Sequence, residues 1–442
     1  MKGKQSLPFT DFFILYEPLC FFITHFTRYV LLEIGKTNEH IFMFGGKWMK
    51  RLAHHWILLT IFLYAMFAFS LTVRAESVAE NHAPFAKDAK AALLLEQDTG
   101  EILFQKNAHD RLPPASLTKV MTMLLTMEAL EEGVIKEEEL VTVSERAASM
   151  GGSQVFLSEG EQMTVKDLLK AVAIASANDA SVALAERISG SEPAFVARMN
   201  EKAEELGLKN TKFQNASGLP AKEHYTTAYD IALVARELLR YDKITEYTNL
   251  YEDYLRKGEK NEFWLVNTNR LVRFYPYVDG LKTGYTKEAK YCLVATAKKD
   301  DMRLVSVIMG ADSSKDRNRM TMDLLDYAFS QYTIDRIFAQ GETVGQYTNL
   351  QSENVNYEVK TKQGISLLRK KGEKSLDYDV EIKIDDRKSL PIEKGEPIGS
   401  IVVRTPENQQ VETAIYADEQ IDVASIFTLM KRSLKTIAKF ES

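Results

Sequence analysis

The order of apolar runs along this chain constrains its fold more than any other feature. Two helix-like, largely apolar segments, Val120–Leu130 and Val165–Ile188, precede two strand-like segments, Tyr291–Ala297 and Arg303–Met309. Only a polar turn at residues 298–301 separates the two strand-like segments, as in an antiparallel hairpin. Because helices and antiparallel strands follow one another in mixed order, the sequence predicts an α+β fold of packed helix and sheet layers.

A different pattern follows this mixed region. Tyr378, Val380 and Ile382 alternate with polar residues, as the residues of a half-buried strand do. No combination of residues with catalytic chemistry is visible there. With 442 residues the chain is long enough for two packed domains. We predict a larger domain over residues 85–338 and a small all-β, sandwich-like domain over residues 341–417.

The C-terminal residues have two faces when they are placed at helical spacing. Apolar side chains form one face and basic side chains the other, which predicts an amphipathic helix over residues 419–440. The two faces comprise Val423, Ile426, Phe427, Met430, Leu434, Ile437 and Ala438 on the apolar side and Lys431, Arg432, Lys435 and Lys439 on the basic side. Such a helix can lie in an anionic membrane surface. Its spacing fits a helix docked on its own domain equally well, and we favour the membrane because the basic residues cluster at the terminus.

An export signal precedes the predicted domains. Residues 49–51 are basic after a methionine, residues 56–71 are apolar, and residues 73–75 form a cleavage site that ends in a small residue. We interpret residues 49–75 as a signal peptide and expect the mature protein at the outer face of the cytoplasmic membrane. A retained transmembrane anchor is the alternative, since the apolar run nearly reaches spanning length. Residues 1–48 suit neither a membrane span nor a domain, and we interpret them as an upstream extension ahead of the true start.

Composition excludes several classes of function. The formal net charge of −6 leaves no basic surplus for a nucleic-acid partner. Two cysteines, Cys20 and Cys292, make a disulfide framework untenable, and Cys292 lies in an apolar run as a core residue does. The seven histidines show no metal-ligand spacing such as H-E-x-x-H, and none accompanies a G-x-S-x-G turn. We expect no metal and no other cofactor.

The S-x-x-K motif at residues 116–119 is the only one in the chain. Two prolines precede it, so it is expected at the start of a helix, where residues three apart share a face. The hydroxyl of Ser116 and the amine of Lys119 can then approach within hydrogen-bond distance. An amine accepts a proton only when it is neutral, so the pKa of Lys119 must be lowered by burial or by a second cation. Lys282 is the candidate for that cation.

Two further triplets complete a candidate constellation. An S-A-N triplet at residues 176–178 interrupts the second helical region and could add a hydroxyl and an amide. A K-T-G triplet at residues 282–284 is predicted to open a strand. Each triplet alone is a weak signal, because another S-x-N occurs at residues 352–354 in what we interpret as a linker. The prediction of a catalytic site therefore rests on the order of the three motifs within one exported domain.

Together these elements resemble the S-x-x-K, S-x-N and K-T-G motifs of penicillin-recognising serine enzymes. From about residue 85 to the C-terminus the chain is similar to low-molecular-mass penicillin-binding proteins that act as D-alanyl-D-alanine carboxypeptidases, especially those of spore-forming bacilli. Residues 114–119, 150–153, 206–215 and 218–219 carry the likeness further. The resemblance implies a β-lactamase/transpeptidase-like domain with an antiparallel sheet, helices on both sides and a helical subdomain. It also implies a role in cell-wall, and by association spore-wall, maturation.

The resemblance implies a catalytic role for three residues. Ser116 would attack the carbonyl between two D-alanines of a peptidoglycan stem peptide and form an acyl-enzyme, while Lys119 takes its proton. Ser176 would pass a proton toward the leaving amine, and water would then release the shortened peptide. β-Lactam antibiotics are implied as covalent inhibitors.

A further set is implied to bind the substrate. Asn178 would orient the amine and hold a peptide amide, Lys282 would add positive potential, and Thr283 would bind the terminal carboxylate. The backbone N–H groups of Ser116 and Tyr285 would form an oxyanion hole, worth roughly 3–4 kcal/mol. The complete implied set is Asn178, Lys282, Thr283, Gly284, Tyr285 and Arg317.

Alternatives stay open at this point. A class A β-lactamase shares the three motifs, but its E-x-x-L-N signature is missing after Glu205. An endopeptidase or transpeptidase on the same scaffold and a catalytically silent wall-binding module are the others. Arg317 is expected either to assist carboxylate binding or to make a structural salt bridge. His224 is expected to make a structural hydrogen bond rather than to act in catalysis.

Overall fold

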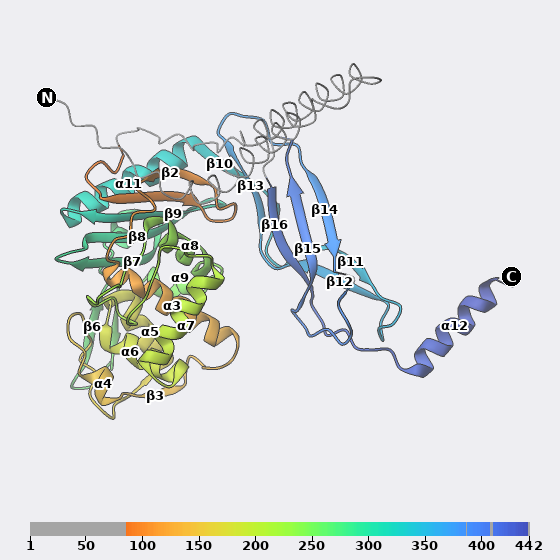
Figure 1. Cartoon of the computed structure of the whole chain (residues 1–442), viewed down its shortest axis with the longest axis horizontal. Coiled ribbons are helices and arrows are strands. Elements are labelled where there is room, and N and C mark those ends of the chain that lie inside the picture. The colour runs from red at the N-terminus through yellow and green to blue at the C-terminus, as the bar shows by residue number, and fades with distance from the viewer. Residues whose placement is uncertain (1–84, 386, 407–409, 441–442) are drawn as a thin grey trace, which may run out of the picture. The chain divides into compact units, whose positions relative to one another are not determined.

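Figure 1 shows the computed structural model of the chain, which describes residues 85–385, 387–406 and 410–440. The three sequence motifs, most of the predicted β domain and the predicted terminal helix lie within these ranges. The predicted signal peptide over residues 49–75 and the extension over residues 1–48 lie outside the described residues.

A five-stranded antiparallel sheet forms the centre of the first domain, in the order β2-β1-β9-β8-β7. Its strands are β1 (Ala91–Glu96), β2 (Ile102–Lys106), β7 (Val278–Thr286), β8 (Lys290–Lys299) and β9 (Met302–Ala311). The predicted hairpin is β8 with β9, and both strands extend beyond the predicted bounds. Within the described sheet β7 has a partner on one side only, so its other edge is free. Lys282, which we predicted to open a strand, lies in the middle of β7.

Helices cover both faces of this sheet (Figure 1). Alternate residues of β1 enter two different cores: Leu94 packs with the apolar side chains of α11, whereas Leu93 and Leu95 pack with those of α3 and α8. This confirms the predicted α+β class with helices on both sides of an antiparallel sheet. The helices are η2 (Ala115–Thr118), α3 (Lys119–Glu131), α4 (Glu145–Ala148), α5 (Val165–Ala175), α6 (Asn178–Ser189), α7 (Glu192–Glu205), α8 (Ala228–Leu238), α9 (Ile244–Thr248), α10 (Leu271–Phe274) and α11 (Ser314–Gln331).

Local sequence sets the ends of the helices that frame the site. The Thr227 hydroxyl accepts the N–H of Asp230 at 2.9 Å and caps α8, which begins at Ala228. Between α5 and α6 the backbone turns at Ser176, with φ 61° and ψ 33°. The S-A-N triplet therefore connects two buried helices. Two small two-stranded antiparallel sheets complete the domain, β3 (Leu140–Thr142) with β4 (Gln162–Thr164) and β5 (Glu252–Leu255) with β6 (Phe263–Val266).

The second domain is all β in its described part. It has a five-stranded sheet in the order β11-β12-β16-β15-β14 and a separate pair, β10 with β13. Val359, Ile401 and Ile415 are fully or almost fully buried between these strands. The strands are β10 (Tyr332–Phe338), β11 (Thr343–Thr348), β12 (Asn356–Thr361), β13 (Ile365–Lys370), β14 (Asp379–Ile384), β15 (Pro397–Arg404) and β16 (Gln410–Ala417).

A last helix, α12 (Ile426–Phe440), follows the β domain. None of the helices that the structure describes combines the length and the apolarity needed to cross a lipid bilayer.

Candidate active site

The nucleophile candidate lies in a tight turn that starts a buried helix. Residues 115–118 form the short helix η2, and Lys119 continues it as the first residue of α3. This geometry places Lys119 Nζ 3.2 Å from Ser116 Oγ. The predicted contact between the hydroxyl and the amine is therefore present, because residues three apart share one face of the helix.

Lys119 is surrounded by hydrogen-bond acceptors. Its Nζ donates to Asn178 Oδ1 at 2.7 Å and to the Ser217 carbonyl at 2.5 Å, and its side chain is fully buried. A neutral amine has two N–H bonds and one lone pair. The two acceptors satisfy both N–H bonds, so the lone pair is left to point at the hydroxyl of Ser116. The geometry thus suits a neutral lysine that accepts a proton.

Burial and a second cation both favour the neutral form of this lysine. Burial lowers the pKa of Lys119 well below its usual value, the positive charge of Lys282 lowers it further, and Asp179 opposes them. The pKa of Lys282 itself falls to about 7, first through burial and then through the charge of Arg317. The predicted electrostatic partner of Lys119 is therefore in place.

The S-A-N turn is held by polar contacts from the loop before it. Asn178 Nδ2 donates to the Gly151 carbonyl at 2.6 Å, which fixes the amide so that its oxygen faces Lys119. Asp179, fully buried, accepts the N–H of Val155 at 3.0 Å. Our sequence interpretation missed Asp179, although a charged residue directly after S-x-N was a visible signal.

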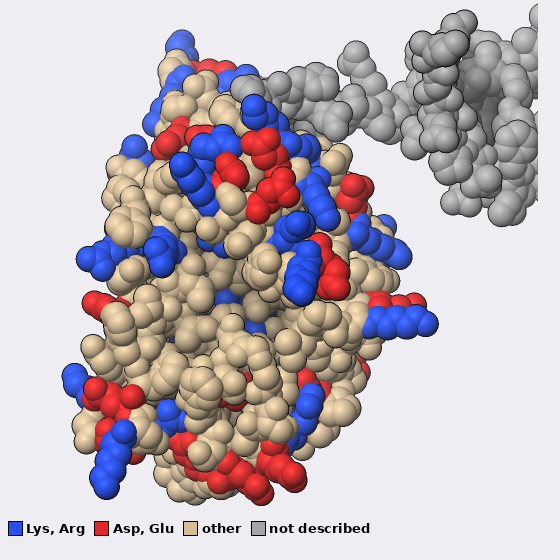
Figure 2. All heavy atoms as spheres, turned by 90° about the vertical axis from the view of Figure 1, so that its left-hand side faces the viewer, with Lys and Arg blue, Asp and Glu red and all other residues tan. Residues whose placement is uncertain are grey.

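A cavity of about 510 Å³ opens at the free edge of β7, and we call it the catalytic groove. Ser116, Ser176, Thr283, Tyr285 and Arg317 are among the residues that line it. Figure 2 shows this side of the molecule, with a hollow that has a largely uncharged rim and lysine or arginine atoms inside it. None of the described residues that line the groove is an Asp or a Glu.

Glycine at position 284 lets β7 approach the nucleophile. A Cβ there would lie 3.2 Å from the Pro114 carbonyl oxygen and 3.3 Å from the Leu117 nitrogen. The K-T-G strand therefore packs directly on the turn that carries Ser116. Beside it, the Thr283 hydroxyl bonds the Thr268 hydroxyl at 2.7 Å, which orients Thr283 at the groove.

Arg317 lies at the far end of the groove. Its side chain is 6% exposed, and burial lowers its pKa to about 10. Its guanidinium donates to Asn318 Oδ1 at 2.8 Å, and no ion pair among the described residues includes it. Of the two expected roles, the structural salt bridge is therefore absent from the described part of the chain.

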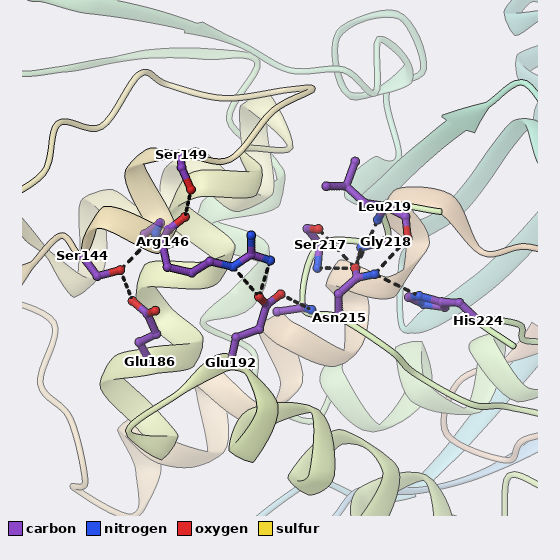
Figure 3. Close-up of polar contacts among 12 residues, drawn as sticks. Ser144, Arg146, Ser149, Glu186, Glu192, Asn215, Ser217, Gly218, Leu219 and His224 are labelled. Atoms are coloured by element: carbon purple, nitrogen blue, oxygen red, sulfur yellow. Dashed lines mark hydrogen bonds and ion pairs between the residues drawn. The ribbon is translucent and has the colours of Figure 1, made fainter. Parts of the chain in front are cut away.

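A second network, shown in Figure 3, holds the loop that supplies the Ser217 carbonyl. Asn215 Oδ1 accepts the backbone N–H groups of Ser217, Gly218 and Leu219 at 3.2, 2.7 and 3.2 Å. His224 lies against the same asparagine, with 3.4 Å between Asn215 Nδ2 and His224 Nδ1. Our sequence interpretation missed the Ser217 carbonyl, because a backbone group gives no signal in the residue types.

His224 connects this loop to the nucleophile turn. Its Nε2 lies 2.9 Å from Thr118 Oγ1, and the side chain is buried. Burial lowers the pKa of His224 to about 4. The imidazole is therefore neutral at pH 7 and makes the structural hydrogen bond that we predicted.

Among the described residues no group of His, Cys, Asp and Glu side chains could hold a metal ion. Cys292 is fully buried in β8, as predicted for a core residue.

Comparisons with known proteins agree with this geometry. A sequence model described as peptidase S11, D-alanyl-D-alanine carboxypeptidase, matches residues 77–313, and one described as penicillin-binding protein 5, C-terminal domain, matches residues 332–423. The chain is 49% identical over 376 residues to D-alanyl-D-alanine carboxypeptidase DacF of Bacillus subtilis, which covers 85% of this chain and 97% of that protein.

Solved structures give the same result. Penicillin-binding protein 5 from Haemophilus influenzae superposes with a TM-score of 0.59 at 30% identity, covering 76% of this chain and 98% of that one. Penicillin-binding protein D2 from Listeria monocytogenes in its ampicillin-bound form gives 0.50 at 31% identity, over 55% and 98%. With its fold, motifs and most of its length matched, this chain belongs to the peptidase S11 family of D-alanyl-D-alanine carboxypeptidases.

Proposed function

We propose that this chain removes the C-terminal D-alanine from peptidoglycan stem peptides through an acyl-enzyme on Ser116. The observation that carries the proposal is the 3.2 Å contact between Ser116 Oγ and Lys119 Nζ, with the amine buried among acceptors. A neutral Lys119 takes the proton of the hydroxyl as Ser116 attacks the carbonyl carbon of the penultimate residue. General base catalysis of this kind contributes about 10²- to 10⁴-fold.

The leaving amine needs a proton, and we assign its transfer to Ser176. Ser176 lines the groove together with Ser116. Its backbone is in the left-handed conformation and forms the turn between the two buried helices α5 and α6. The proton that Lys119 accepted moves through the Ser176 hydroxyl to the departing D-alanine. Water then attacks the ester, with Lys119 again as the base, and releases the shortened peptide.

The substrate carboxylate binds at the cationic end of the groove. Thr283 offers a hydroxyl there, and Lys282 and Arg317 supply positive charge without a paired carboxylate among the described residues. The carbonyl oxygen rests between the N–H groups of Ser116 and Tyr285. β-Lactam antibiotics, which carry a carboxylate beside a reactive amide, acylate the same serine.

Slow deacylation distinguishes this activity from that of a β-lactamase. A class A β-lactamase uses a glutamate to activate the deacylating water, and no described residue that lines the groove is acidic. The penicilloyl-enzyme is therefore long-lived.

Mass spectrometry of the intact protein after penicillin treatment tests the proposal. We expect one penicilloyl adduct on the peptide that contains Ser116, and we expect Ser116→Ala to lose both the adduct and D-alanine release. Ser330→Ala, which removes an exposed hydroxyl, is the matched control and keeps both. Release of D-alanine by Ser116→Ala would show that the nucleophile lies elsewhere.

We also propose that α12 anchors the protein to the outer face of the cytoplasmic membrane. Phe427 is 79% exposed and Leu434 is 64% exposed, although both belong to the apolar face of the helix. Arg432 meanwhile donates to the carbonyls of Ser352 and Glu353, which ties the helix to the β domain by its polar side. A helix docked on its own domain buries its apolar side chains, so these exposures favour a lipid partner.

A further inference from the structure

Asp179 is a buried carboxylate that the mechanism described above does not use. It directly follows Asn178 at the start of α6, and its side chain is fully buried. No ion pair among the described residues includes it. A buried charge that touches no cation is costly unless hydrogen bonds compensate it. The contacts of this carboxylate therefore show what it is retained for.

Backbone N–H groups of one loop supply the compensation. Asp179 Oδ2 accepts the N–H of Val155 at 3.0 Å and the N–H of Leu157 at 3.1 Å. Its Oδ1 accepts the N–H of Ala180 at 2.9 Å, at the start of the same helix. The carboxylate therefore binds the N–H groups on both sides of Phe156. We call residues 151–157 the brace loop.

A second charged side chain binds the carbonyls of the brace loop. Arg256, with 5% of its side chain exposed, donates to the carbonyl of Val155 at 3.1 Å and to that of Phe156 at 3.4 Å. The same guanidinium pairs with Glu161 at 2.5 Å. Asp179 therefore holds the donors of this short stretch of backbone, and Arg256 holds its acceptors.

The backbone of Phe156 shows that these contacts enforce the shape of the loop. Its φ is 56°, a left-handed value that a bulky residue rarely adopts. Its side chain is 65% exposed, so burial of the ring contributes little to holding it. Strained backbone of this kind persists only where surrounding contacts fix it, and it is concentrated at functional sites. The hydrogen bonds of Asp179 and Arg256 are such contacts.

The other end of the brace loop touches a residue of the catalytic site. The Gly151 carbonyl accepts Asn178 Nδ2 at 2.6 Å, and the Ser153 carbonyl accepts the backbone N–H of Asn178 at 2.7 Å. A Cβ at Gly152 would lie 2.8 Å from Asn178 Nδ2, so the loop packs closely on the amide. The loop therefore fixes both the backbone and the amide of Asn178, whose oxygen bonds Lys119.

We propose that Asp179 is a positioning residue for acylation: its carboxylate holds the brace loop, and the loop keeps the Asn178 amide against Lys119. Arg256 supports the same loop through its carbonyls. If the loop shifts, the Gly151 carbonyl moves, the Asn178 amide can rotate, and Lys119 loses an acceptor. This inference rests on the proposed function, because it takes Lys119 as the base.

The charge of Asp179 adds an effect on pH dependence that support of the fold alone would not have. Burial and Lys282 lower the pKa of Lys119, and Asp179 opposes them. Arg317 acts on Lys282, and His224, beside the nucleophile turn, is neutral at pH 7. Without the negative charge the pKa of Lys119 falls further. The acidic limb of the acylation rate, where Lys119 gains its proton, then moves to lower pH.

The rate constant of penicillin acylation, measured against pH in the full chain, tests the proposal. Asp179→Asn keeps the size of the side chain, removes its charge and turns an amino group toward one of the loop N–H groups. We expect a fall of roughly 10- to 100-fold, since a displacement of about 1 Å has effects of this order. We also expect the acidic limb to move to lower pH.

Arg256→Lys disturbs the loop without changing any charge. A lysine can still pair with Glu161, but it lacks the planar fork that also reaches two carbonyls. Acylation is expected to fall less than in Asp179→Asn, by about three- to tenfold. The acidic limb should stay where it is in the wild type.

Arg187→Lys is the matched control. Arg187 also lies on α6, and its guanidinium bonds the Glu139 carboxylate and the Val134 carbonyl, much as Arg256 bonds a carboxylate and carbonyls. None of these three residues lines the catalytic groove. This variant should acylate at the wild-type rate. The labelled fraction counts folded molecules, so a loss of stability lowers that fraction and leaves the rate constant unchanged.

Three results would overturn the proposal. One is a rate constant for Asp179→Asn within twofold of the wild type, whatever its labelled fraction. Another is an acidic limb that stays in place in Asp179→Asn, because the residue would then support the fold without acting on Lys119. The third is an equal loss in Arg256→Lys and Arg187→Lys. Failure of the proposed function looks different, because Ser116→Ala would then still be acylated by penicillin.

Discussion

Two buried lysines lie side by side in this site, and their neighbours give them different tasks. Lys119 bonds two neutral oxygens, Asn178 Oδ1 and the Ser217 carbonyl, and Asp179 is the negative charge that opposes the lowering of its pKa. Lys282 has a less depressed pKa, about 7, and its charge both lowers the pKa of Lys119 and attracts the substrate carboxylate. These surroundings support the proposed roles of Lys119 as a base and of Lys282 as a cation.

The task of Lys119 can be tested by fixing its charge. Lys119→Arg keeps the positive charge at neutral pH, because a guanidinium holds its proton much more strongly than an amine does. It cannot accept the serine proton, so penicillin acylation is expected to fall by about 10²- to 10⁴-fold. Lys119→Met, uncharged and of similar length, should show the same loss, and thermal unfolding of both variants reports whether they fold. Acylation by Lys119→Arg within tenfold of the wild type contradicts the proposed base.

If Lys282 acts as the cation that attracts the substrate carboxylate, kcat/KM for D-alanine release should have a bell-shaped pH profile. Activity rises with pH as Lys119 loses its proton, because the neutral amine is the base. It then falls as pH rises through about 7, because Lys282 loses the charge that binds the carboxylate. Lys282→Arg keeps that charge, so its alkaline limb should move up by at least one pH unit. If Lys282→Arg leaves the alkaline limb unchanged, the titration of another group causes that limb.

At the scale of elements, the site depends on a loop that brings a carbonyl and a glycine against the nucleophile turn. Asn215 gathers three N–H groups of this loop on one oxygen, as Figure 3 shows, which fixes the Ser217 carbonyl toward Lys119. Gly218 then packs on Ala115 with φ +84°. The loop therefore acts as a support for both the base and the nucleophile.

Gly218→Ala tests this support against a matched control. Both Gly218 and Gly207 have positive φ, +84° and +70°, so alanine strains the backbone by about 1 kcal/mol at either position. Only at position 218 would the new Cβ collide with backbone, 1.9 Å from the Ala115 carbonyl oxygen, whereas nothing lies within 4 Å at position 207. Penicillin acylation should fall roughly 100-fold in Gly218→Ala, since displacements of about 1 Å have that effect. Gly207→Ala should acylate normally, and similar rates in both variants would exclude the support.

His224, in the same loop region, predicts how stability depends on pH. Its pKa falls from 6.5 when unfolded to about 4 when buried, so the unfolded state binds a proton more readily between these values. Its contribution is complete above pH 6.5 and is lost as pH falls toward 4, about 2 kcal/mol of unfolding free energy between pH 7 and pH 5. His224→Gln should lack this loss when urea unfolding is compared at the two pH values. An equal loss in variant and wild type would assign it to other groups.

At the scale of the whole chain, the features that could be predicted from the sequence are those that depend on the types and spacing of the residues. Periodicity located the helices and the β8–β9 hairpin, and the three motifs predicted Ser116, Asn178 and Lys282 together. The Ser217 carbonyl could not be predicted, because the position of a backbone group beside Lys119 depends on tertiary packing. The position of Lys282 was also missed, because it lies in the middle of β7 and not at the start of the strand.

The terminal helix gives the prediction that concerns the protein as a whole. Purified protein should sediment with vesicles that contain an anionic phospholipid and weakly or not at all with vesicles of phosphatidylcholine alone. Added salt should weaken this binding, because each basic residue near the surface adds about 1 kcal/mol that salt screens. Phe427→Glu and Leu434→Glu place a charge on the apolar face and should reduce binding at least tenfold.

Val380→Glu controls for the change in net charge. Val380 is 43% exposed on β14, away from the helix, so the same substitution there adds equal negative charge without altering the apolar face. It should leave vesicle binding almost unchanged, and all three variants should release D-alanine from a soluble peptide at the wild-type rate. If Phe427→Glu and Leu434→Glu bind vesicles as the wild type does, the exposed face of α12 has another partner. If they lose D-alanine release as well, α12 contributes to the folded domain, because a surface anchor has no effect on a dissolved substrate.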